Sequence, residues 1–173
     1  MKKIFVVLCC AFSYLGVAQE DVTLKTLQGY VGQVSNQVVQ LAEAFDESQY
    51  DWRPQEGVRS VRESILHIAS TNYFLATKMG HTPPEDIDFM TMEANITGKD
   101  NVLAALKQSN AFILDKIGQE DVSRFGEEVD FGFAKFSRLT GLLIVLEHSG
   151  EHKGQLIAYA RSNKVVPPWS VAQ

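Results

Sequence analysis

The chain has 173 residues, a length that suits one domain with a substantial buried core. Apolar residues make up 45% of it and charged residues 21%, an ordinary globular balance that excludes a disordered or collagen-like chain. The formal net charge of −5 argues against nucleic acid as the main partner.

Residues 1–18 have the pattern of a secretory signal peptide. Two lysines follow the first methionine, residues 4–15 are apolar apart from one serine, and small residues precede a cleavage point after Ala18. The apolar run is shorter than the roughly 20 residues that span a bilayer, which disfavours a retained membrane anchor. A lipoprotein is disfavoured because Leu8 precedes Cys9, where a small residue is needed.

We therefore expect an exported protein, periplasmic or secreted, whose mature domain is residues 19–173 and has no stable membrane anchor. Both cysteines lie in the leader, so the mature chain would have neither disulfides nor thiolate ligands. Removal of the leader also removes two lysines, leaving 14 basic and 21 acidic residues and a net charge of −7.

The first two predicted helices cover residues 21–45 and 60–79. Helical spacing of apolar residues marks the first one: Val31, Val34, Val38, Leu41, Ala42 and Phe45. A loop containing Pro54 and Gly57 follows. Ser60 and Glu63 have capping-box spacing at the start of the second helix, and Gly80 is a typical end.

A third helix is predicted from Thr97 or Gly98 to Gly118, after two prolines at 83 and 84. Residues 119–135 are a polar loop, with a short extended piece expected near residues 128–133. The fourth helix covers residues 137–163 and is the most apolar of the four, as a buried helix would be. Four helices predict an all-α four-helix bundle, while the long first connection leaves the order of the helices open.

His148 and His152 stand four residues apart on the fourth helix, so their side chains lie about 40° apart around its axis and roughly 6 Å along it. Two imidazoles at this spacing can bind one metal ion. The alternative is that each is an ordinary core or surface histidine, because such pairs also arise by chance. Glu147 and Glu151 precede them and are candidates for orienting a ring nitrogen.

A third ligand must come from another element, and the candidates are His67 and His81. His81 follows the helix-ending Gly80 and suits an exposed loop, which favours His67. A helical wheel, however, places His67 away from the main apolar stripe of its helix. The stripe also contains Asn72, whose amide needs a hydrogen-bond partner if it is buried.

Three stretches resemble the DinB-like superfamily of metal-binding four-helix bundles. They are Trp52-Arg53-Pro54 with Gly57 to Ala69, then Glu147 to Leu156, then Tyr159 to Asn163 with Val166-Pro167-Pro168. The resemblance covers nearly all of the mature chain. It implies an up-down-down-up bundle in which one histidine of the second helix and two of the fourth surround a divalent metal, here His67, His148 and His152.

Three imidazoles leave a coordination position open, which is the pattern of catalytic rather than structural sites. Zinc, nickel, manganese or iron are the candidate metals, because the ligands alone do not name one. The open site favours a metal-dependent hydrolase or transferase acting on a small molecule. The resemblance adds a thiol transferase as what it implies, since some members transfer thiols. The alternative is a non-catalytic metal- or ligand-binding bundle with a role in stress response or interaction. The catalytic residues stay unassigned, and exposed helix faces would permit a homodimer.

Overall fold

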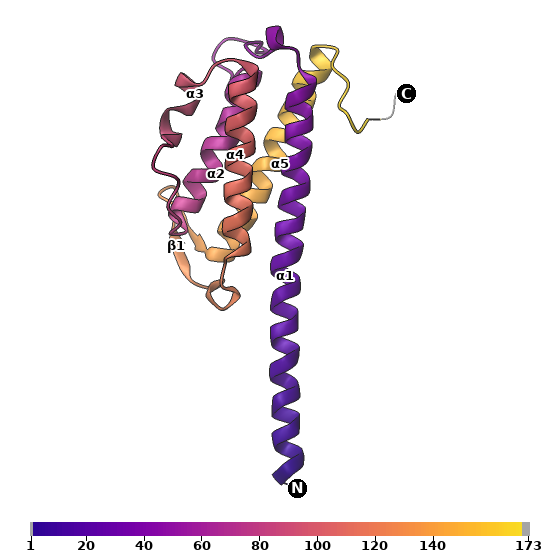
Figure 1. Ribbon diagram of the computed structural model, residues 1–173, viewed down its shortest axis with the longest axis vertical. Helices are drawn as coiled ribbons and strands as arrows, with labels where there is room; N and C mark the ends of the chain where they lie inside the picture. The colour runs from indigo at the N-terminus through magenta and orange to yellow at the C-terminus, as the bar shows by residue number, and fades with distance from the viewer. Residues whose placement is uncertain (1, 171–173) are drawn as a thin grey trace.

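A computed structural model of the protein describes the backbone of residues 2–170 and the side chains of residues 22–170. Four long helices form the body of the molecule (Figure 1): α1 Lys2–Ala44, α2 Val61–Lys78, α4 Lys99–Gly118 and α5 Arg138–Ser162. The predicted all-α four-helix bundle is confirmed. From residue 44 onward, each of the four helices begins and ends within two residues of the predicted position.

Helix α1 is much longer than the bundle, and its N-terminal half projects from it as a lone helix (Figure 1). This half contains the segment that we expect to be removed as a signal peptide. Among the described residues, no helix combines the length and the hydropathy that crossing a bilayer requires.

The signals at both ends of α2 act as predicted, and α5 has a cap that was not predicted from the sequence. The Ser60 hydroxyl accepts a hydrogen bond from the Glu63 amide, and the Glu63 carboxylate accepts one from the Ser60 amide at 2.8 Å. Gly80 follows α2 with a φ of 92°, in the left-handed region that favours glycine at a helix end. Ser137 caps α5 by accepting from the amide of Thr140.

The connections contain structure that the sequence did not reveal. A 3-10 turn, η2 Phe89–Thr91, and the one-turn helix α3 Met92–Asn95 follow the two prolines, and η1 Glu47–Gln49 and η3 Val122–Arg124 are similar short turns. The expected extended piece is β1 Glu128–Asp130, which pairs antiparallel with β2 Lys135–Ser137.

Contacts between helix ends fix the order of the bundle. Gln28 on α1 bonds to the Leu114 carbonyl late on α4, and Lys99 at the start of α4 bonds to the Glu43 carbonyl near the end of α1, so these helices are antiparallel. Asn72, near the middle of α2, bonds to Asn110, near the middle of α4. Arg62 at the start of α2 bonds to the carbonyl of Ile96 just before α4, so α2 and α4 are parallel.

Helix α5 runs antiparallel to α2, because Arg138 at its start bonds to the Met79 carbonyl and Tyr159 near its end bonds to the Arg59 carbonyl. The result is the up-down-down-up order implied by the family resemblance, with α2 and α5 side by side (Figure 1). The core fills the space between the four helices, and the following side chains are among its largest: Tyr73, Phe45, Phe131, Leu41, Ile65 and Leu66.

Candidate metal centre

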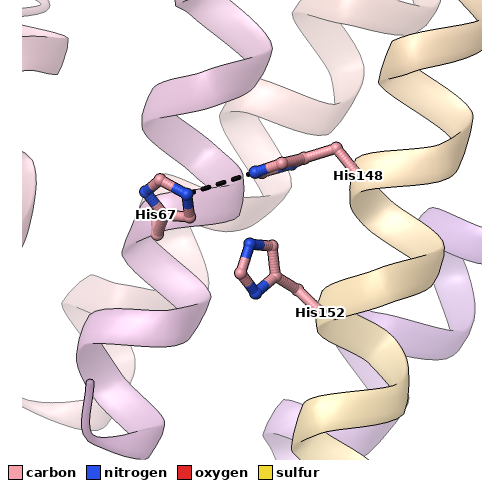
Figure 2. Close-up of side chains that lie close together, drawn as sticks. All are labelled: His67, His148 and His152. Atoms are coloured by element: carbon pink, nitrogen blue, oxygen red, sulfur yellow. Dashed lines mark hydrogen bonds between the residues drawn. The ribbon is translucent and has the colours of Figure 1, made fainter. Parts of the chain in front are cut away.

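The antiparallel pair α2 and α5 brings three histidines to one point. His67 lies midway along α2, and His148 and His152 occupy successive turns of α5 (Figure 2). One ring nitrogen from each lies within 4.8 Å of the others. The Nε2 atoms of His67 and His148 are 3.2 Å apart.

Two of the three rings are held by a hydrogen bond at Nδ1. The Glu93 carboxylate of α3 lies 2.9 Å from His67 Nδ1, and the Gln155 amide oxygen lies 2.7 Å from His152 Nδ1. Because both partners are acceptors, they favour the tautomer with hydrogen on Nδ1 and leave Nε2 with a lone pair. Oriented rings of this kind are typical of histidines that bind metals.

The acceptors are themselves anchored. Gln155 donates from its amide nitrogen to the Tyr159 hydroxyl at 2.8 Å, and that hydroxyl donates to the Arg59 carbonyl. Glu93 also accepts a 2.9 Å ion-pair hydrogen bond from the Arg59 side chain. The segment before α2 therefore supports both orienting residues.

Glu147 and Glu151, the candidates for this role in the sequence, are both exposed on α5. Because they directly precede their histidines, they point about 100° away around the helix. The orienting hydrogen bonds go instead to Glu93 and Gln155. Gln155 could have been found from its spacing, three residues after His152, whereas Glu93 lies in a four-residue helix with no periodic pattern to mark it.

The surroundings of His67 and His148 favour the neutral imidazole, which is the form that binds metal. Burial lowers the pKa of His148 to about 3, with further contributions from the neighbouring His152 and His67. Burial and the charge of Arg59 also lower the pKa of His67, although its hydrogen bond to Glu93 acts in the opposite direction. Neutral rings present lone pairs at neutral pH without competition from protons.

A divalent cation suits this cluster. Ligand nitrogens at about 2.0–2.1 Å from a tetrahedral metal lie roughly 3.3 Å from one another. The His67–His148 separation of 3.2 Å already fits, and a ring nitrogen of His152 lies within 4.8 Å of both. Among the described side chains, the group of candidate ligands has these three members, so it could hold a metal ion with a position left open.

A cleft of about 410 Å³ begins beside His67 and His148 and continues between α2 and α5. Arg59 and Glu93 border it near the histidines, and Phe133 of the β1–β2 turn borders it too. Its volume is within the range of small-molecule sites. A ligand in the cleft would therefore be adjacent to two of the three clustered histidines.

His81, the other candidate third ligand, lies elsewhere. Its Nε2 is 2.7 Å from the carboxylate of Glu120, which also accepts two 3.2 Å hydrogen bonds from the buried Arg138. This network joins the end of α2 to the start of α5. Asn72 is also structural, because its amide donates to Ser109 and Asn110 within the core.

Known proteins share both the sequence pattern and the fold. YjoA of Bacillus subtilis (strain 168), an uncharacterized protein, is 29% identical over 128 residues, which cover 70% of this chain and 79% of that protein. Two crystal structures have the same fold. A DinB-like protein from Bacillus cereus ATCC 10987 has a TM-score of 0.68 at 12% identity, covering 80% of this chain and 91% of its own. The DinB-like protein YjoA of B. subtilis has a TM-score of 0.64 at 17% identity, covering 82% and 94%.

The family model of the DinB superfamily matches residues 32–156, a range that includes all three clustered histidines. With nearly three quarters of its length matched, the chain belongs to the DinB superfamily.

Proposed function

We propose that the protein binds one divalent metal ion through Nε2 of His67, His148 and His152 and is a metal-dependent enzyme acting on a small molecule. The observation that carries the proposal is the convergence of three imidazoles, two of them held by an acceptor at Nδ1, beside a cleft that His67 and His148 line. Three protein ligands with one open position is the arrangement of catalytic rather than structural sites.

The bound metal would supply a Lewis acid that activates water or a thiol, as a hydrolase or a thiol transferase requires. Around it, Glu93 and Gln155 hold the rings of His67 and His152 in position. Glu93 also borders the cleft, so one carboxylate lies within the candidate substrate site without being a ligand. Its ion pair with Arg59 holds a guanidinium at the same end of the cleft, where it can donate hydrogen bonds to an anionic group.

The alternative is a binding protein without catalysis. A fourth protein ligand would have favoured it by closing the metal site. The open position and the adjoining cleft support the enzyme instead, because neither is needed merely to hold a metal.

Metal analysis of the purified protein is the first test. We expect about one equivalent of a divalent metal, and its loss in the double variant His148→Ala, His152→Ala. His81→Gln is the matched control, because it alters a histidine outside the cluster and should retain the metal. Unchanged stoichiometry in the double variant would refute the metal site.

The metal so identified is then used in a screen of hydrolase and thiol-transfer substrates. Turnover that disappears in the double variant is the expected result. Turnover that persists in that variant would refute a metal-dependent activity at this site. No turnover in any substrate class with the loaded protein would favour the binding protein.

We also propose export, on the basis of the basic, apolar and small-residue pattern of residues 1–18. Expression of the full chain in a bacterial host should yield an extracytoplasmic protein that begins at Gln19. N-terminal sequencing of the fractionated protein tests this, and an intact Met1 on cytoplasmic protein would contradict it.

A further inference from the structure

The cleft beside the three histidines changes character along its length. Charged and imidazole groups surround its head, whereas six of its remaining lining residues are apolar: Phe74, Leu75, Phe89, Met90, Phe133 and Ile144. Such a site is suited to a ligand with a polar head and an apolar tail.

Two exposed side chains border the apolar part. Met90 of η2 is 75% exposed and Phe133 of the β1–β2 turn is 64% exposed, although both are large and apolar. They come from separate connections, yet they line the same cleft. Burying them against a ligand would remove apolar surface from water, which a bound tail would do and a small polar substrate would not.

We infer that the substrate is an amphiphile, with a metal-binding, anionic head at the histidines and an unbranched acyl or aryl tail along the apolar cleft. This inference rests on the proposed metal site. The head is assigned by charge, because a divalent ion favours an anion, whereas the Arg59 guanidinium beside it is already paired with Glu93.

The length of the tail follows from the helix. His67 and Phe74 are seven residues apart on α2, which is about 10 Å along its axis. With C–C bonds of about 1.5 Å, this distance corresponds to an extended chain of about eight carbons. The volume of about 410 Å³ is that of a small-molecule site, whereas a docked helix with side chains about 10–12 Å across needs a far larger groove.

A series of straight-chain hydroxamic acids tests the inference, because all members share one metal-chelating head. Binding of acetohydroxamic, hexanohydroxamic and octanohydroxamic acid to the metal-loaded protein is measured by calorimetry. Full burial of one methylene group raises the affinity roughly four-fold. If the tail stays open to solvent on one side, each methylene raises it about two-fold. We therefore expect affinity to rise by roughly 60-fold over the six methylenes that separate the two-carbon from the eight-carbon acid.

Phe133→Ser and Met90→Ser should each remove much of this gain while leaving the affinity for acetohydroxamic acid unchanged. Val166→Ser is the matched control, since Val166 is also exposed and apolar but does not line the cleft. It should preserve the full dependence on chain length.

Each other outcome has a distinct meaning. Equal affinity for all three acids would overturn the amphiphile and leave the metal site intact. Failure of acetohydroxamic acid to bind the loaded protein would refute the open coordination position, and the proposed function with it. If the rise in affinity with chain length disappears at high protein concentration, a second copy of the chain occupies the cleft. This result would also overturn the inference.

Discussion

Glu93 should determine how tightly the protein holds its metal, although it is not a ligand. Its carboxylate lies 2.9 Å from His67 Nδ1 and is the acceptor that fixes the tautomer and orientation of that ring. Removing such a partner typically lowers metal affinity 10- to 100-fold. The side chains of His67 and Glu93 are 23% and 33% exposed, so water can replace part of the hydrogen bond. We therefore expect the lower part of this range for Glu93→Ala, about 10- to 30-fold.

Competition with a chromophoric chelator measures this affinity. Glu93→Gln separates two effects of the carboxylate, because the amide oxygen still accepts from Nδ1 while the charge that balances Arg59 is lost. We expect it to lose only a few-fold. Glu147→Ala is the matched control, an exposed carboxylate next to His148 in the sequence. Equal affinity in Glu93→Ala and the wild type, or an equal loss in Glu147→Ala, would refute the assignment of Glu93.

Three further predictions concern stability. Gly141→Ala should destabilise the protein by about 1–3 kcal/mol in urea unfolding, because the new methyl group would overlap the buried Phe131 ring. Gly154→Ala on the same helix meets open space and should stabilise by up to about 1 kcal/mol, and the same sign for both would contradict the packing. In the metal-free protein, the pKa of about 3 for His148 lies below its unfolded value near 6.5, so the unfolded state binds the proton first as pH falls. Stability should therefore fall from pH 6.5 towards 3, by up to about 1.4 kcal/mol per pH unit from this group, and less steeply in His148→Gln. Finally, EDTA should lower the Tm of the loaded protein, since a ligand at 100 times its Kd contributes about 2.7 kcal/mol, and an unchanged Tm would argue against metal binding.

The sequence was a good guide wherever local chemistry decides the structure. Ser60, Gly80 and Ser137 set helix ends through caps and a left-handed turn that involve only neighbouring residues. The periodic apolar positions of the first helix likewise predicted its core face, because all six of them are buried. The order of the helices did not follow from these patterns, because it depends on contacts such as Gln28 with Leu114 that join distant parts of the chain.

The site was predictable only in part for the same reason. The spacing of His148 and His152 is a local property, whereas the approach of Glu93 depends on how the segment after α2 folds back beside it. His81 is a residue whose structural role the sequence did not indicate. Its position after a helix end suggested a loop residue without a role, yet the fold places it against the nearly buried Glu120.

The helical wheel that seemed to argue against His67 explains why the site is open. A histidine on the main apolar stripe of α2 would point into the core, where neighbouring side chains could close the metal site. His67 lies off that stripe and stays partly exposed, while His152 reaches it from the buried face of α5. The three nitrogens therefore meet at the rim of the bundle, between the core and the cleft. A metal at this boundary could be held by the packed helices on one side and meet a ligand on the other, which a site at the centre of the core could not do.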